Sequence, residues 1–192
     1  GGYAAFYAMV SGGLSPILSV LIAMVICTVL GLLIERIAYK PLRSAPSLAV
    51  LITAIGVSYF LQNLALLLFG ANTKTFQSVV TFGGISLAGG QLQLTGTTIV
   101  TIAACIIIVV GLSLYINKTR TGQAMLAVSE DRGAAQLMGI NVNSTIAMTF
   151  AIGSALAAIA GCLLCSAYPS LNPYTGSMPG IKAFTAAVFG GI

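Results

Sequence analysis

The sequence predicts an all-α membrane protein, a polytopic bundle of transmembrane helices with four full spans and two partial ones. Hydrophobic residues make up 58% of the 192 residues and charged residues only 6%, whereas about 25% of residues are charged in ordinary soluble domains. The apolar residues gather in runs of about 20, enough to cross a hydrocarbon layer about 30 Å thick as a helix. Lipid offers no hydrogen bonds to an exposed backbone, so these runs must be helical. Residues 1–192 are expected to form a single transmembrane domain.

The predicted elements are apolar runs separated by polar loops. The full spans are residues 14–38, 48–70, 97–116 and 145–167. Ser15 and Pro16 suit the start of the first span, because serine caps helices and a proline in the first turn needs no amide partner. Residues 1–10 and 181–192 are apolar, but they are too short to cross a bilayer alone. These two partial spans indicate an internal piece of a longer protein.

Basic residues are distributed unevenly between the loops. Two of the eight Lys and Arg residues, Lys74 and Lys182, lie on one side of the predicted spans. The residues on the other side are Arg36, Lys40, Arg43, Lys118, Arg120 and Arg132. Because cytoplasmic loops carry the excess of Lys and Arg, residues 117–143 are expected in the cytoplasm and residues 71–96 outside it. Membrane insertion accounts for the net charge of +5. The chain has no basic stripe interleaved with aromatic residues, so no nucleic-acid partner is expected.

The two outer loops differ in kind. Residues 71–96 are polar and rich in glycine, with apolar residues alternating on either side of Ala88, Gly89 and Gly90. This pattern predicts a small β-hairpin on the membrane face. The hairpin serves either as a solvated connector, the favoured interpretation, or as a docking surface. Residues 168–180 contain three prolines and are expected not to continue a helix, because proline lacks the amide donor and clashes with the preceding turn.

No constellation of residues for catalysis is visible in the sequence. Cys162 and Cys165 form a CxxC pattern, but the chain has no His, and Cys27 and Cys105 lie on other spans. A closed zinc site needs four ligands, so small buried hydrophobic residues are the better interpretation. A phosphate loop of the form G-x-x-x-x-G-K-[S/T] is absent. The chain is therefore not expected to be an enzyme, to bind a metal or to hold a cofactor of its own.

Ionisable residues are missing from the interiors of the four predicted full spans. Proton- and ion-coupled carriers usually hold such residues at membrane depth, so transport by this chain would take its energy from a partner. Glu35 and Arg36 lie near the inner end of the first span, where they are expected to form an interfacial pair.

Neutral polar residues recur on one face of the second span. Thr53, Gly56, Phe60 and Asn63 follow helical spacing, with Gln62 beside them. Such groups either bond a neighbouring helix, the favoured interpretation, or line a pathway for a solute.

Small residues mark one face of the fourth span. Gly153, Ala157 and Gly161 fall four residues apart. Spacing of this kind leaves a flat helix face that lets another backbone approach closely. The face is expected to serve helix packing within a bundle.

Residues 117–143 form a strongly polar segment between two spans. They hold three of the eight basic residues and two of the three acidic ones. A short helix is predicted here, with acids near its start and Gly139 at its end, since acids favour the positive end of a helix and glycine favours a left-handed cap. A cytoplasmic helix held between two spans is suited to bind a partner protein that supplies the energy for transport.

The run from Glu130 to Ile140, EDRGAAQLMGI, resembles the EAA loop of ATP-binding-cassette importer permeases. Both have an acid, paired alanines and a glycine a few residues on, although three residues separate Glu130 from the alanines here. The longer phrases ERIAYKPLRSAPSLAVLITAIGVSYFLQNLALLLFG, TRTGQAMLAVSEDRGAAQLMGI and YPSLNPYTGSMPGIKAFTAAVFGGI resemble permeases of the high-affinity branched-chain amino-acid (leucine/isoleucine/valine) importers, of the LIV-H type. The likeness covers nearly the whole chain.

The resemblance implies that the cytoplasmic loop is a coupling helix that inserts into a groove on a cassette ATPase. The residues that match the coupling loop are Glu130, Asp131, Arg132, Ala134, Ala135 and Gly139. An ordinary amphipathic loop helix is the alternative. The resemblance further implies a permease of the bacterial inner membrane that carries branched-chain amino acids. Its partners would be a second permease subunit, two cassette ATPases that bind the ATP, and an extracytoplasmic amino-acid-binding protein. Transport of urea or short amides, and a passive channel or membrane scaffold, stay open as alternatives.

Overall fold

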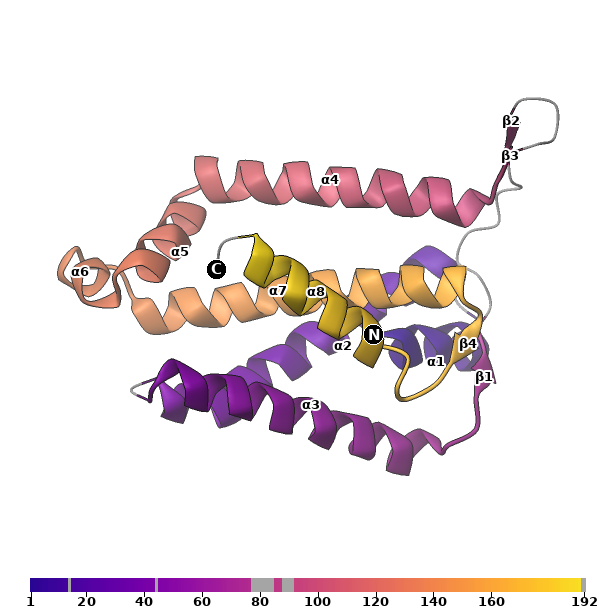
Figure 1. Ribbon diagram of the computed structural model, residues 1–192, viewed down its shortest axis with the longest axis horizontal. Helices are drawn as coiled ribbons and strands as arrows, with labels where there is room; N and C mark the ends of the chain where they lie inside the picture. The colour runs from indigo at the N-terminus through magenta and orange to yellow at the C-terminus, as the bar shows by residue number, and fades with distance from the viewer. Residues whose placement is uncertain (14, 44, 77–84, 88–91, 191–192) are drawn as a thin grey trace.

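Long helices run lengthwise through the molecule (Figure 1). This computed structural model describes residues 1–192 except 14, 44, 77–84, 88–91 and 191–192. Within the described residues, four helices are long and apolar enough to cross a membrane. They are α2 (Pro16–Ile34), α3 (Ser47–Phe69), α4 (Gly96–Lys118) and α7 (Val142–Ala167). They confirm the all-α polytopic class, and the predicted bounds differ from the observed ones by a few residues. The predicted start at Leu14 lies outside the described residues.

The first span does not end as a plain α-helix. α2 continues into a π-helix, η1 (Glu35–Tyr39), in which the backbone N–H of Lys40 bonds the carbonyl oxygen of Glu35. A short 3₁₀ turn, η2 (Lys40–Leu42), follows. The apolar span therefore extends over Pro16–Leu42.

The partial spans are short helices, α1 (Gly2–Gly12) and α8 (Ser177–Phe189). α8 begins within residues 168–180, so the expectation that this segment does not continue as a helix is wrong for residues 177–180. Pro179 lies in the first turn of α8, where backbone amides have no partner in the helix and a missing N–H costs little.

Two short antiparallel ribbons lie at one end of the bundle (Figure 1). β2 (Ile85–Leu87) pairs with β3 (Leu92–Leu94), with Ile85 opposite Leu94. This pairing confirms the predicted hairpin, whose turn at Ala88, Gly89 and Gly90 lies outside the described residues. β1 (Lys74–Thr75) pairs with β4 (Ser170–Leu171) and ties the loop after α3 to the segment after α7. Nothing in the alternation of apolar residues predicts this second ribbon.

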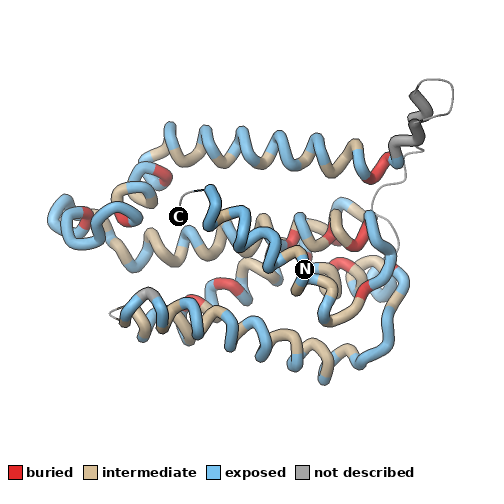
Figure 2. The backbone as a smooth tube through the Cα atoms, in the orientation of Figure 1, coloured by how far each residue is buried: buried red, intermediate tan, exposed pale blue. Residues whose placement is uncertain are grey.

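The core lies where α2, α7 and α1 meet, and α2 and α7 make the most extensive contact in the described fold. Its buried residues are Ala5, Ala23, Phe76, Cys162, Cys165 and Leu171. Burial of both α7 cysteines agrees with their interpretation as small hydrophobic residues, and Figure 2 shows how few positions of the fold are buried. The backbones approach closely: a Cβ built on Gly31 of α2 would lie 2.6 Å from the Cβ of Ser154 on α7.

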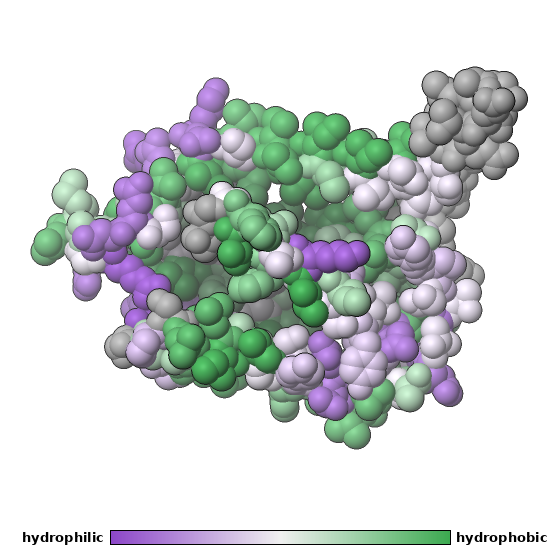
Figure 3. Space-filling model, in the orientation of Figure 1, coloured by the Kyte–Doolittle hydropathy of each residue, from purple (hydrophilic) through white to green (hydrophobic). Residues whose placement is uncertain are grey.

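The outer helices bury little of their surface. The apolar windows of α3 and α4 contain no buried residue within the described structure, and exposed positions run along both helices in Figure 2. Hydrophobic side chains cover α4 in Figure 3. Exposed apolar surface of this extent is what lipid or further helices cover in a membrane protein.

Candidate functional site

The polar segment between α4 and α7 lies at the same end of the bundle as the α2–α3 corner, residues 40–43. Two helices, α5 (Arg120–Glu130) and α6 (Arg132–Leu137), form this segment, and Figure 3 shows hydrophilic side chains gathered at their end of the molecule. Arg132 Nη1 of α6 donates a hydrogen bond of 3.3 Å to the carbonyl oxygen of Arg43. The basic residues assigned to one side of the membrane thus share one end of the fold, while β1, which carries Lys74, lies at the opposite end (Figure 1).

A tight turn at Thr119 sets the direction of α5. Thr119 ends α4 and begins α5, and its Oγ1 accepts a hydrogen bond of 3.0 Å from the backbone N–H of Gly122. A Cβ built on Gly122 would lie 2.4 Å from the carbonyl oxygen of Tyr115 and 2.5 Å from Cα of Ile116. Only glycine fits between these backbones. Sequence reasoning missed both residues, although a threonine before a new helix is a recognised capping signal.

Asp131 divides the polar segment into two helices. Its backbone is extended (φ −147°, ψ 111°), and its Oδ1 accepts hydrogen bonds from the N–H groups of Gly133 (2.7 Å) and Ala134 (3.1 Å). The prediction of one helix with both acids near its start is therefore wrong for Glu130, which is the last residue of α5. Asp131 alone caps α6, because its side chain replaces the missing partners of the first-turn amides.

The far end of α6 has the predicted left-handed glycine. Gly139 has φ +82°, and its N–H donates to the carbonyl oxygen of Gln136 at 3.0 Å. The N–H of Ile140 donates to the carbonyl oxygen of Ala135 at 3.0 Å. Together these bonds form a Schellman cap, which stops the helix and satisfies its last carbonyls. Asn141 then caps α7 through its Oδ1, which accepts from the N–H of Ser144 at 3.2 Å.

The side chains of α6 divide between the protein and solvent. Ala135 is buried against its own chain, so of the predicted alanine pair only Ala134 is open to a partner. Leu137 and Met138 are 90% and 83% exposed, although both are large and apolar. These two residues could not be singled out from the sequence, because an apolar pair next to a span is typical of lipid-facing positions as well.

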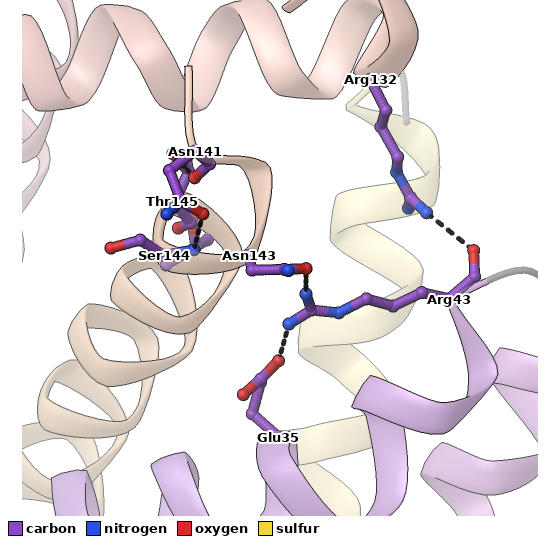
Figure 4. Close-up of polar contacts among 8 residues, drawn as sticks. Glu35, Arg43, Arg132, Asn141, Asn143, Ser144 and Thr145 are labelled. Atoms are coloured by element: carbon purple, nitrogen blue, oxygen red, sulfur yellow. Dashed lines mark hydrogen bonds and ion pairs between the residues drawn. The ribbon is translucent and has the colours of Figure 1, made fainter. Parts of the chain in front are cut away.

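Arg43 joins the α2–α3 corner to the neighbouring elements (Figure 4). Its guanidinium forms an ion pair with the Glu35 carboxylate and donates to Oδ1 of Asn143. Glu35 is buried, while Arg36 is exposed. The expected pair of Glu35 with Arg36 is therefore wrong in its partner, because the π-turn and the corner return Arg43 to the Glu35 carboxylate. Between the corner and α6 lies an open groove lined by Arg43, Arg132, Gln136, Gly139, Ile140, Asn141, Val142, Asn143 and Ile146.

The polar residues predicted on α3 bond within their own helix. Thr53 Oγ1 donates to the carbonyl oxygen of Ala49 at 2.8 Å, and Asn63 Nδ2 donates to that of Tyr59 at 2.8 Å. Gln62 donates to Ser58 Oγ at 3.3 Å. A Cβ built on Gly56 would meet no described atom within 4 Å. The described residues bring none of this set to a second helix, so helix contact and pathway lining both stay predictions.

The small-residue face of α7 is only partly used. Gly161 approaches another backbone, since its Cβ would lie 3.7 Å from the N atom of Gly2. Gly153 and Ala157 are exposed, and a Cβ on Gly153 would meet no described atom within 4 Å. The close packing against α1 and α2 uses the adjacent face of α7, with Ala158 fully buried. A packing role for Gly153 and Ala157 stays a prediction that requires a helix outside the described residues.

These features define a multi-pass helical membrane protein with a capped two-helix insertion at one end of its bundle. The chain belongs to the family described as branched-chain amino acid transport system / permease component, whose family model matches residues 1–192. Proteins of this family are membrane transport permeases, and this chain is one of them.

Individual relatives agree with the family. The chain is 44% identical over 175 residues to the high-affinity branched-chain amino acid transport system permease protein LivH of Escherichia coli K12, covering 88% of this chain and 56% of that protein. It is 41% identical over 174 residues to BraD of Pseudomonas aeruginosa, with the same coverage. A probable LivH of Methanocaldococcus jannaschii is 29% identical over 199 residues, covering 100% of this chain and 61% of that protein. The chain thus spans little more than half the length of these relatives. No solved structure matches it.

Proposed function

We propose that this chain is part of the membrane-spanning permease of an ATP-driven importer of branched-chain amino acids. Separate cassette ATPases supply the energy, and α6 is the coupling helix that they bind. Membership in the permease family supports the proposal, as do relatives whose names state high-affinity branched-chain amino acid transport. The full assembly would contain a second permease subunit, two ATPases and an extracytoplasmic amino-acid-binding protein, in the inner membrane of a bacterium.

The observation that carries the coupling role is the exposed apolar pair at the end of α6. Leu137 and Met138 are 90% and 83% exposed, at the end of a short helix that begins with the charged Arg132 and is fixed at both ends by caps. Large apolar side chains displayed in a polar setting mark surfaces that a protein partner covers. Ala134 lies exposed on the same helix and leaves room for close approach.

The proposed cycle follows from this attachment. ATP binding closes the two ATPases and drags the coupling helices with them, which opens the bundle toward the binding protein. Hydrolysis then resets the permease. A passage for leucine, isoleucine or valine would be mostly apolar with a few neutral hydrogen-bonding groups. Thr53, Gln62 and Asn63 supply such groups on α3, and Gly56 leaves space beside them, on a helix without buried positions in its apolar window.

Uptake measurements test the proposal. The full-length permease, reconstituted in proteoliposomes with its ATPases and binding protein, should accumulate radiolabelled valine only when ATP is present. Uptake of radiolabelled urea instead of valine would show a permease for small amides. Failure of any ATPase to copurify with the full-length protein would favour a passive channel or scaffold and contradict the proposal.

A further inference from the structure

We infer that Arg43 is a positioning residue that joins α6, the α2–α3 corner and the start of α7 into one unit. A displacement of α6 would then move the inner ends of α2 and α3. The inference rests on the proposed function, because it states how a pull on the coupling helix reaches the spans.

The contacts of Arg43 come from three separate elements (Figure 4). Its Nη2 pairs with the carboxylate of Glu35 in η1, and its Nη1 donates to Asn143 in the first turn of α7. Its carbonyl oxygen accepts the hydrogen bond from Arg132 of α6. One residue therefore binds the end of the first span, the start of the fourth and the coupling helix together.

α6 and α3 have little direct contact in the described fold. In the described structure α6 packs mainly on α5 and α7, and the main contact of α3 is with η1. α3 has no comparable contact with α6 or α7. The shortest described connection from α6 to α3 therefore passes through Arg43, which precedes α3 in the chain. Without it, the described connection from α6 to α3 is the longer one through α7 and η1, directly or by way of α2.

Burial makes the Glu35–Arg43 contact the firm part of this connection, whereas the hydrogen bonds to Asn143 and Arg132 are exposed. The side chains of Glu35 and Arg43 are only 6% and 19% exposed. A pair shielded from water holds its geometry, whereas an exposed pair exchanges its partners with solvent. Arginine is required because its planar fork reaches two acceptors at once, which the single ammonium of lysine cannot do in the same way.

The element that receives the displacement has an unusual backbone. η1 is a π-helix of five residues (Glu35–Tyr39) that includes the partner of Arg43. π-turns occur mostly as single turns within α-helices and are frequent at functional sites. Tyr39 of η1 also packs against Phe150 of α7, with the rings tilted by 44° and 5.0 Å between their centroids. The contacts of Arg43 thus reach a segment where the first span departs from regular α-helix geometry.

Transport per ATP in the reconstituted complex tests the inference. Arg43→Gln should leave ATPase binding and ATP turnover intact but lower valine transported per ATP about tenfold, within the usual range of coupling energies. Arg43→Lys should recover part of the loss. Arg36→Gln is the matched control, because Arg36 is an exposed cation on the same π-helix, and it should behave like the wild type. A wild-type ratio in Arg43→Gln would overturn the inference, whereas wild-type protein without ATP-driven valine uptake would overturn the proposed function.

A spectroscopic distance tests the joint independently of transport. Spin labels at Ala134→Cys on α6 and Leu48→Cys on α3, with Cys27 and Cys105 replaced by Ala, report the separation of the two helices in the purified full-length permease. Both label sites are exposed. The distance distribution should be narrow in this background and broad when Arg43→Gln is combined with Arg132→Gln, because Arg132 bonds the backbone carbonyl of residue 43 and that bond survives Arg43→Gln alone. Identical distance distributions with and without the two substitutions would overturn the inference, whatever the transport assay shows.

Discussion

Two glycines, Gly31 and Gly122, allow close contacts between helices that a Cβ at either position would prevent. Gly31 lets α2 approach Ser154 of α7, and Gly122 lets α5 turn back against the last turn of α4. The difference between the two is what a new Cβ would meet. At Gly31 it meets a serine side chain, but at Gly122 it meets the backbone of Tyr115 and Ile116, which cannot move aside. Gly122 is therefore the less replaceable of the two.

Gly122→Ala should destabilise the full-length protein by about 1–3 kcal/mol, the usual cost of overpacking a tight contact. The expected readout is a lower midpoint of thermal unfolding in detergent. Gly111→Ala is the matched control, since Gly111 lies within α4 and a Cβ there meets no described atom within 4 Å. Alanine at that position should be neutral or stabilising by up to about 1 kcal/mol, because it favours the helix. Equal midpoints for the two variants would contradict the packing described for Gly122.

The side chain of Asp131 holds the start of α6. A helix of six residues is too short to be stable by itself, so its two caps decide whether it forms. Asp131→Ala should destabilise α6 by about 1 kcal/mol and raise the hydrogen-exchange rates of its amides without altering those of α7. Asp131→Asn keeps an acceptor oxygen and should exchange nearly as the wild type does. Exchange in the Asn variant as fast as in the Ala variant would show that charge, and not the hydrogen bonds, holds the cap.

At the scale of elements, α6 combines a fixed backbone with an exposed apolar tip. Leu137→Ser and Met138→Ser should each weaken binding of the isolated ATPase to the purified permease by about 2 kcal/mol, as expected for interface hot spots. This loss corresponds to about 30-fold in Kd, measured by biolayer interferometry in detergent. Leu67→Ser is the control, because Leu67 is 83% exposed on α3, near its end opposite the α2–α3 corner. Unchanged affinity for the ATPase in both Leu137→Ser and Met138→Ser would contradict the proposed coupling role of α6.

The elements differ in how far sequence determines them. The spans were predictable because a lipid-facing backbone must bond within its own helix, and the hairpin because its apolar residues alternate around glycines. The break at Asp131 is marked locally by a capping residue. Two adjacent acids nevertheless predict one helix start, and this hides the end of α5 at Glu130. The partner of Glu35 could not be read locally, since Arg43 returns through a π-turn. The contact with Asn143 joins residues 100 apart in the chain, which no local pattern indicates.

At the scale of the whole molecule, the two ends of the bundle differ in charge and in structure. One end holds α5, α6 and the α2–α3 corner with their basic residues, and the other holds the β1–β4 ribbon. At that second end Lys74 donates to the hydroxyl of Tyr7 and lies 4.5 Å from the centroid of its ring. Neutral aromatic groups hold this lysine but leave its positive charge in place. The larger number of basic residues at the α6 end favours that end as cytoplasmic.

Cysteine labelling of intact cells tests this orientation directly. Asn72→Cys and Ala134→Cys place single exposed thiols at opposite ends of the bundle, in full-length protein with Cys27 and Cys105 replaced by Ala. A membrane-impermeant maleimide should label Asn72→Cys in intact spheroplasts and Ala134→Cys only after permeabilisation. Labelling of Ala134→Cys from outside would reverse the topology and with it the coupling role, because ATP and its ATPases are in the cytoplasm. Labelling of both thiols only after permeabilisation would instead mean that residue 72 is covered, and a second thiol at Thr73 on the same loop would then report that end.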